Sequence, residues 1–201
     1  MQLEPSASNV VDVYQTMVGL VGPRPIAWVT TVSAEGVVNL APFSFFNMFG
    51  ANPPVVVFSP TLKRDGSKKD TLRNLEALGE FVVNISTAAN ADAINGTSKE
   101  LPPSESEVGH FGLNTVPSAV VKPPRIAEAP AALECRVLQI IPIGSGSIAA
   151  NLVIGQVVMI HADDGVLDEK GRPDPRKLKQ VARMGGDFWC RASDLFELTR
   201  P

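Results

Sequence analysis

The sequence has few of the residues from which metal sites and disulfide frameworks are built. Its 201 residues include two histidines, His110 and His161, and two cysteines, Cys135 and Cys190. Two histidines and scattered cysteines do not have the spacing of metal ligands, so we expect no metal site. The cysteines lie far apart in the chain, which favours free thiols in a reducing compartment over a disulfide framework.

Strong net charge and long apolar runs are also missing. The formal net charge is -3, and without a basic surface we expect no nucleic-acid partner. No apolar run approaches about 18 residues, so we expect no transmembrane helix and no membrane partner. Residues 1–9 are polar and lack the basic and apolar regions of a secretory signal, which predicts a cytoplasmic protein.

The familiar motifs of nucleophilic and dinucleotide-binding enzymes are absent or misleading. There is no G-x-S-x-G, so a serine nucleophile on a sharp turn is not indicated. Residues 144–149, GSGSIA, match G-x-G-x-x-A. That motif must follow a strand and open a helix, whereas here more strand-like sequence follows. We therefore interpret these glycines as the turn of a hairpin between two long strands.

What the sequence does contain is a series of short strand-like runs with little helix between them. Such a pattern predicts a mainly β protein with peripheral helices, folded as a closed or nearly closed antiparallel, Greek-key-like barrel. We expect one domain over residues 1–201, with a barrel core at about 20–165 and a C-terminal extension at about 166–201. The predicted strands are 25–32, 37–40, 55–59, 81–85, 133–138 and 152–161, and the predicted helices are 67–79, 88–93 and 174–182.

Residues 97–130 form the least regular third of the chain, with paired prolines at 102–103 and 123–124. A loop of this length in a single domain is usually functional or mobile. We expect it to wall or cover a ligand site; the alternative is a solvent loop without a role.

The stretch from Gly22 to Pro60 carries the strongest functional pattern. It contains RPIAWVTT at 24–31 and APFSFFN at 41–47, and further along the chain come KDT at 69–71 and RMGG at 183–186. Over nearly its whole length the chain resembles the flavin reductase-like proteins of the FMN-binding split-barrel group. That group includes flavoredoxins and the reductase components of two-component monooxygenases.

The resemblance implies a bound FMN. Its phosphate would lie at the predicted helix start, with Lys69 and Thr71 as ligands and Asp70 as a helix cap or an orienter of Lys69. Ser59 is a weaker phosphate or ribityl contact. Without the resemblance, residues 67–71 are better interpreted as a solvated charge run with an ordinary cap.

The resemblance also implies that Ala41 to Asn47 runs along the flavin ring, with the Ser44 hydroxyl facing it and Asn47 near its polar edges. A strand alternates its sides, so at least one of the phenylalanines there belongs to the core. Thr30 or Thr31 can face the ring, and Trp28 is a stacking, core or dimer-interface residue. The complete predicted cofactor set is Trp28, Thr30, Thr31, Ala41, Pro42, Phe43, Ser44, Phe45, Asn47, Ser59, Lys69, Asp70 and Thr71.

Arg24 and His161 are the predicted catalytic residues, in positioning roles only. By the resemblance, Arg24 approaches the cofactor or a nicotinamide phosphate, and His161 lies near the open face of the flavin. The alternatives are a surface ion pair for Arg24 and a structural role for His161. Relatives commonly have tyrosine after the Gly-Gly step, where this chain has Phe188 and Trp189, so a hydroxyl contact is lost there but stacking remains.

The function implied by the resemblance is an NAD(P)H-dependent FMN oxidoreductase that passes hydride from nicotinamide to FMN. The alternatives are a flavoredoxin-like carrier of electrons from a protein donor and a non-enzymatic flavin-binding protein. A homodimer is expected, with a monooxygenase or electron-transfer protein as a further partner. The sequence leaves open NADH against NADPH, FMN against FAD, and the electron acceptor.

Overall fold

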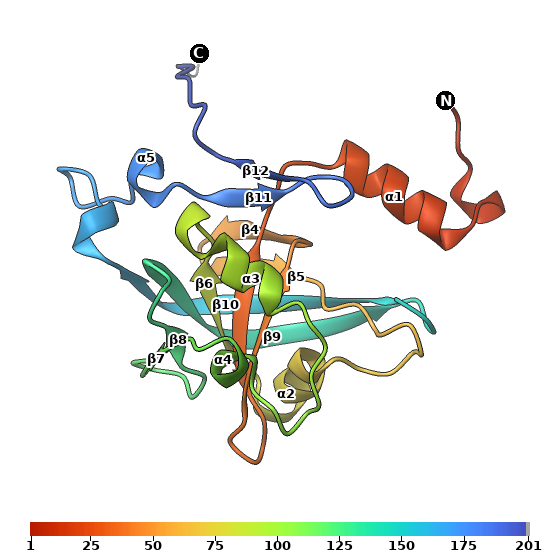
Figure 1. Ribbon diagram of the computed structural model, residues 1–201, viewed down its shortest axis with the longest axis horizontal. Coiled ribbons are helices and arrows are strands. Elements are labelled where there is room, and N and C mark those ends of the chain that lie inside the picture. Colours follow the sequence, from red (N-terminus) through yellow and green to blue (C-terminus); the bar gives the residue numbers. More distant parts are fainter. Residues whose placement is uncertain (200–201) are drawn as a thin grey trace.

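A computed structural model, which describes residues 1–199, contains a seven-stranded antiparallel sheet (Figure 1). The strand order is β3-β2-β6-β9-β10-β5-β4. The two edge strands, β3 and β4, follow each other in the chain through residues 44 and 45, so the sheet curls into a barrel. The strands are β2 (Ala27–Val32), β3 (Val38–Phe43), β4 (Phe46–Ala51), β5 (Pro54–Phe58), β6 (Glu80–Ile85), β9 (Ala131–Ile143) and β10 (Ala150–Ala162).

Smaller elements surround this barrel. A three-stranded sheet joins β1 (Arg24–Pro25), β11 (Val181–Arg183) and β12 (Trp189–Arg191), and β7 (Thr115–Val116) pairs with β8 (Arg125–Ile126). The helices are α1 (Val10–Leu20), α2 (Asp70–Leu78), α3 (Ala91–Gly96), α4 (Glu107–His110) and α5 (Pro175–Leu178), with short 3-10 turns η1 (Pro5–Ala7), η2 (Ala88–Asn90) and η3 (Asp164–Val166). Within the described chain no helix is long and apolar enough to cross a membrane.

The barrel interior is filled by aromatic and branched side chains. The Phe58 ring lies between Phe43 and Phe81, with ring centroids 5.3 Å and 5.2 Å away. Gly155 of β10 faces Phe81 so closely that a methyl group at this glycine would overlap the ring. Such close packing fixes the spacing of β6 and β10, because an interior at this density has no room for an added carbon.

A second core lies between the outer face of the barrel and the helices that follow β6. Trp28, Leu40, Ile94 and Ile126 are buried there together. The Trp28 indole N–H donates to the Thr97 hydroxyl, 2.9 Å away, so this buried polar atom has its partner. This core holds α3 and the segment after it against β2 and β3.

Most of the predicted elements are confirmed. The antiparallel β architecture, all six predicted strands and the hairpin turn at 144–146 are present, and Gly79 ends α2 in the left-handed conformation, with φ of 65°. A left-handed residue without a side chain is the commonest way to end a helix. The strands of the large sheet run from residue 27 to residue 162.

Four predictions of local structure were wrong or incomplete. Helix α2 begins at Asp70 rather than Ser67, because Ser67 bonds to Asp65 in the preceding turn. The segment 174–182 divides into α5 and β11, and helix α1 and strand β4 were not predicted. Glu134 of β9 is fully buried although it is charged.

Candidate functional site

The first turn of α2 is fixed on the barrel by a buried network of amides and hydroxyls. Leu72 and Leu75 bury the apolar face of the helix. The Asn39 amide donates to the hydroxyls of Thr71 (3.0 Å) and Thr31 (3.3 Å), and the Asn74 amide donates to Thr31 (3.0 Å). Because buried polar groups are costly without partners, this network fixes the helix start against β2 and β3.

A cavity of about 110 Å³ opens beside this helix start, and we call it the Lys69 cavity. It gathers residues from β3, the start of α2 and the segments 97–101 and 107. Six of the predicted cofactor residues line it, namely Ala41, Pro42, Phe43, Lys69, Asp70 and Thr71. Residues 97–101 form one of its walls, as was expected of the irregular third of the chain.

Lys69 is the cation best placed to receive an anion in this cavity. Burial lowers the pKa of Lys69; Glu100 acts against this shift and Lys63 adds to it. Within the described residues Lys69 forms no ion pair, and its Nζ lies 5.8 Å from the centre of the Phe43 ring. Lys69 is also the residue before α2, where backbone N–H groups of the first helical turn are free to bind an anion.

A second cavity, the Trp189 cavity, continues from the first and measures about 290 Å³. The two share Pro42 and Ser98 in their walls. Ser44 lies in the Trp189 cavity, opposite the β11–β12 hairpin. The Arg183 guanidinium stands over the Trp189 ring at 5.3 Å, so an aromatic and a cation meet at this end of the groove.

Six of the predicted cofactor residues line neither cavity, and the first three of them are Phe45, Asn47 and Ser59. Phe45 is 40% exposed and packs edge-on against Tyr14 of α1, with ring centroids 6.3 Å apart. Asn47 is exposed on β4, where its side chain accepts a hydrogen bond from the Met48 N–H. The Ser59 hydroxyl is buried and has no hydrogen-bond partner among the described residues.

Three other predicted contacts are corrected by their burial. Trp28, Thr30 and Thr31 have no exposed surface. The Thr30 hydroxyl accepts a hydrogen bond from Asn84 at 2.7 Å, and Thr31 belongs to the network that holds α2. These residues act on the site through structure rather than by contact. Asp70 is likewise not the cap of α2, because it is the first helical residue and pairs with Arg73.

Arg24 does not reach either cavity, so its predicted positioning role is corrected. Its guanidinium is buried and donates to the carbonyl oxygens of Val18 (2.7 Å), Val21 (2.6 Å) and Met184 (2.9 Å). Arg24 therefore joins the end of α1 to the loop after β11. Pro23 and Pro25 flank Arg24, but nothing in the sequence indicated that backbone carbonyls would be its partners.

His161 is also placed away from the cavities, and its predicted role is corrected. Its Nε2 lies 2.6 Å from the buried carboxylate of Glu134. Glu134 accepts hydrogen bonds from the backbone N–H groups of residues 119–121. Burial acts to raise the pKa of Glu134, but these N–H groups and His161 outweigh burial and hold the pKa below its usual range. The pair fastens a loop to the barrel.

The sequence reasoning missed several residues that form the groove. Lys63, Ser98 and Lys99 line the Lys69 cavity, and Asn39 and Glu107 stand in its wall. Asn39 alternates with the apolar residues of β3, which is the one signal that would have indicated it. No sequence signal indicated Glu107, because its burial depends on how the irregular segment packs against β3.

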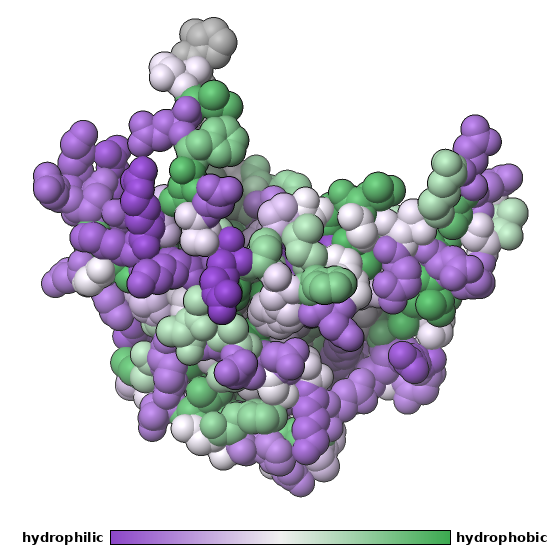
Figure 2. Space-filling model, turned by 45° about the horizontal axis from the view of Figure 1, so that its top comes forward, coloured by the Kyte–Doolittle hydropathy of each residue, from purple (hydrophilic) through white to green (hydrophobic). Residues whose placement is uncertain are grey.

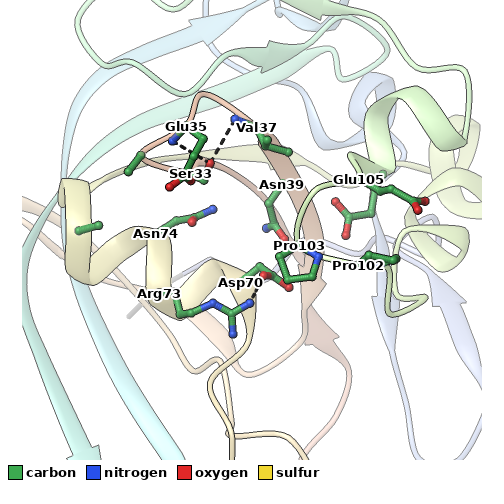
Figure 3. Close-up of a pocket in the computed structure, with 13 residues that line it drawn as sticks. Ser33, Glu35, Val37, Asn39, Asp70, Arg73, Asn74, Pro102, Pro103 and Glu105 are labelled. Carbon is green, nitrogen blue, oxygen red and sulfur yellow. Dashed lines mark hydrogen bonds and ion pairs between the residues drawn. The ribbon is translucent and has the colours of Figure 1, made fainter.

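A third cavity of about 280 Å³ lies on the other side of that wall (Figure 3), and we call it the Asn74 cavity. It is enclosed by the β2–β3 turn, helix α2 and residues 102–107. It shares Asn39, Asp70 and Glu107 with the Lys69 cavity. Within the described residues no group of histidine, cysteine or carboxylate side chains could hold a metal ion.

Comparison with known proteins agrees with this geometry. A family model described as flavin reductase like domain matches residues 21–178. An uncharacterized protein of Halalkalibacterium halodurans is 44% identical over 203 residues, which cover 100% of this chain and 97% of the relative. Component B of nitrilotriacetate monooxygenase from Bacillus cereus has a TM-score of 0.93 at 38% identity, with 98% of each chain covered. The 2-nitrobenzoate 2-nitroreductase of Pseudomonas fluorescens has a TM-score of 0.89 at 33% identity, with 100% of this chain and 96% of that chain covered.

The contacts of Arg24 predict a structural variant. We expect Arg24→Ala to lower the free energy of unfolding by about 2–3 kcal/mol, because three carbonyl oxygens lose a charged donor. Denaturant unfolding measures this loss, with Arg64→Ala at an exposed arginine as the control. Flavin affinity should change little. Unchanged stability together with lost flavin binding would return Arg24 to the ligand site.

Proposed function

Because this chain belongs to the flavin reductase-like domain family and has its split-barrel fold, we propose that it binds FMN and acts as an NAD(P)H-dependent flavin oxidoreductase. One observation carries the proposal. Residues 41–44 and 69–71, together with Arg183, Asp187 and Trp189, are distant in the sequence but line two cavities that share Pro42 and Ser98. Parts of three family segments thus meet at one groove.

The residues present fit the parts of FMN. Lys69, which forms no ion pair among the described residues, and the N–H groups at the start of α2 offer donors for a phosphate. Ala41, Pro42 and Phe43 offer an apolar wall for the body of the ring. Ser44 and the Arg183–Trp189 pair lie at the far end of the groove, where a second flat molecule can stack.

The redox chemistry, a hydride transfer from NAD(P)H to the flavin, is supplied by the cofactors. The protein's task is to hold two flat rings in contact and to limit water around them. The rigid β3 strand and the α2 network fix one side of the groove. The β11–β12 hairpin forms the other side. Because the C-terminal extension and the barrel both contribute to the groove, the proposal takes residues 1–201 as one domain.

The exposed apolar residues support a homodimer as part of the proposal. On α1, Val10, Val11, Met17 and Leu20 are each more than half exposed, as are Met48 and Phe49 on the edge strand β4. Figure 2 shows hydrophobic side chains on the face that carries α1. Apolar patches of this kind usually mark an interface. The two free cysteines, Cys135 and Cys190, agree with a cytoplasmic protein.

The first test is the absorbance of the purified protein, followed by anaerobic mixing with NADH and then NADPH. We expect a flavin band that bleaches quickly with one of the two, which also identifies the donor. A band that persists but bleaches with a reduced protein donor would favour an electron carrier. A redox-idle band would favour a flavin-binding protein, and no flavin after FMN is added would contradict the site.

The second test concerns Lys69. We expect Lys69→Ala to weaken FMN binding by about 1.5–3 kcal/mol, roughly tenfold to hundredfold in Kd, because it removes a charge-assisted contact with the phosphate. The matched control is Lys68→Ala, since Lys68 is exposed and pairs with Glu76. Unchanged affinity in Lys69→Ala, or an equal loss in both variants, would remove Lys69 from the phosphate site.

The third test concerns the dimer. Sedimentation of the wild-type protein should give a dimer, whereas Phe49→Glu on β4 should sediment as a monomer, because a charge cannot be buried without a partner. Ile160→Glu, at an apolar residue that is 64% exposed on β10, is the control. A monomeric wild-type protein, or a dimeric Phe49→Glu variant, would contradict this interface.

A further inference from the structure

The Asn74 cavity is not used by the proposed flavin site, and it differs from that site in charge. Four carboxylates line it, those of Glu35, Asp70, Glu105 and Glu107, against one cation, Arg73. Arg73 is already paired with Asp70 and also donates to the Lys68 carbonyl oxygen. The net field in this cavity therefore favours a positively charged ligand and disfavours a phosphate.

The buried side chains in this cavity keep unused hydrogen-bond acceptors. Asn39, Asn74 and Glu107 are 9%, 7% and 7% exposed. Both amide N–H₂ groups donate to threonine hydroxyls, and one Glu107 oxygen accepts from the Leu40 N–H at 2.9 Å. Within the described residues, no hydrogen bond is formed by the Asn74 Oδ1 or by the second Glu107 oxygen.

Figure 3 shows the Asn74 side chain reaching from α2 into the space between the helix and the β2–β3 turn. Its free carbonyl oxygen thus faces a cavity of about 280 Å³. A residue that is nine-tenths buried and keeps an unused acceptor in such a space has the form of a ligand contact.

The spread of the carboxylates decides between a metal ion and an organic cation. Glu35 comes from the β2–β3 turn, Asp70 from α2, and Glu105 and Glu107 from the segment after Pro103. Among the described residues no three such groups come close enough to bind one metal ion. The walls between them are apolar and include Val37, Pro102 and Pro103.

We propose that the Asn74 cavity binds a small aliphatic amine that carries a primary ammonium group at each end. One ammonium donates to the Asn74 Oδ1 and the Glu107 carboxylate on the floor. The other lies at the rim near Glu35 and Glu105, and the aliphatic chain contacts the prolines. Burial raises the pKa of Glu107, and Asp70 adds to this shift, so ionised Glu107 is unfavourable in the folded protein. A cation beside Glu107 would reduce this unfavourable free energy.

The test uses 1,4-diaminobutane as the probe and 1,4-butanediol, of the same length but uncharged, as its control. Isothermal titration calorimetry at low ionic strength should give saturable one-to-one binding of the diamine. The diol should bind at least tenfold more weakly, and added salt should weaken the diamine. Equal binding of the two compounds, or no saturable binding of the diamine, would overturn the proposal.

Variants locate the binding. We expect Glu35→Gln combined with Glu105→Gln to weaken the diamine by about two- to tenfold, as is usual for partly exposed charge pairs. The matched control is Glu76→Gln, an exposed carboxylate on α2 outside the cavity.

In amide NMR spectra, the side-chain N–H₂ signals of Asn39 and Asn74 should shift on titration in the wild-type protein. If the Asn39 and Asn74 signals do not shift, or if the double variant binds the diamine as tightly as the wild-type protein, the diamine binds elsewhere on the surface. Either result would contradict the proposed site. No flavin or nicotinamide is added in these titrations, and the cavity does not contain Lys69, so the outcome is separate from that of the proposed function.

Discussion

The arrangement of this protein around its cavities depends on how the first turn of α2 is attached to the barrel. Leu72 and Leu75 provide the apolar contact, but apolar contact alone allows a helix to slide. The hydrogen bonds among Asn39, Thr31, Thr71 and Asn74 require one register, because any slide would leave buried amides and hydroxyls without partners. The cavities on the two sides of this network both take their shape from it.

The C-terminal part of the chain is attached by a different means. The buried guanidinium of Arg24 binds carbonyl oxygens of α1 and of the loop after β11, while β1 pairs with β11. A guanidinium suits this task because its donors lie in a fixed plane and it stays charged when buried. The hairpin that carries Trp189 is thus positioned against the barrel by an arginine that never touches the groove.

The sequence predicted the strands and the fold better than it predicted the contacts of individual side chains. Runs rich in Val, Ile and Thr favour strands through local preference. A glycine such as Gly79 ends a helix because it adopts the left-handed conformation without steric cost. Trp28 and Thr30 are buried because α3 and the segment after it cover that side of β2. This covering depends on the tertiary fold, so the local sequence could not predict it. The roles predicted for Arg24 and His161 were wrong for a related reason. Met184, one of the three carbonyl partners of Arg24, and Glu134, the partner of His161, are distant in sequence and carry no motif. Helix α1 was missed because most of its apolar residues face outward, without the buried stripe of a packed helix.

Two buried carboxylates fix the irregular third of the chain, and the number of donors around each explains why their pKa values move in opposite directions. Glu134 accepts three backbone N–H groups and meets His161, and its pKa falls despite burial. It stabilises the fold above the usual carboxylate pKa, and that contribution is lost as pH falls through its lowered value. Glu107 has one strong backbone donor, and burial prevails in raising its pKa. Its ionised form therefore costs stability once the pH rises through the raised value. The Glu134 carboxylate thus holds residues 119–121 to the barrel at neutral pH. The Glu107 carboxylate, beside the Asn74 cavity, keeps one oxygen that no donor among the described residues binds.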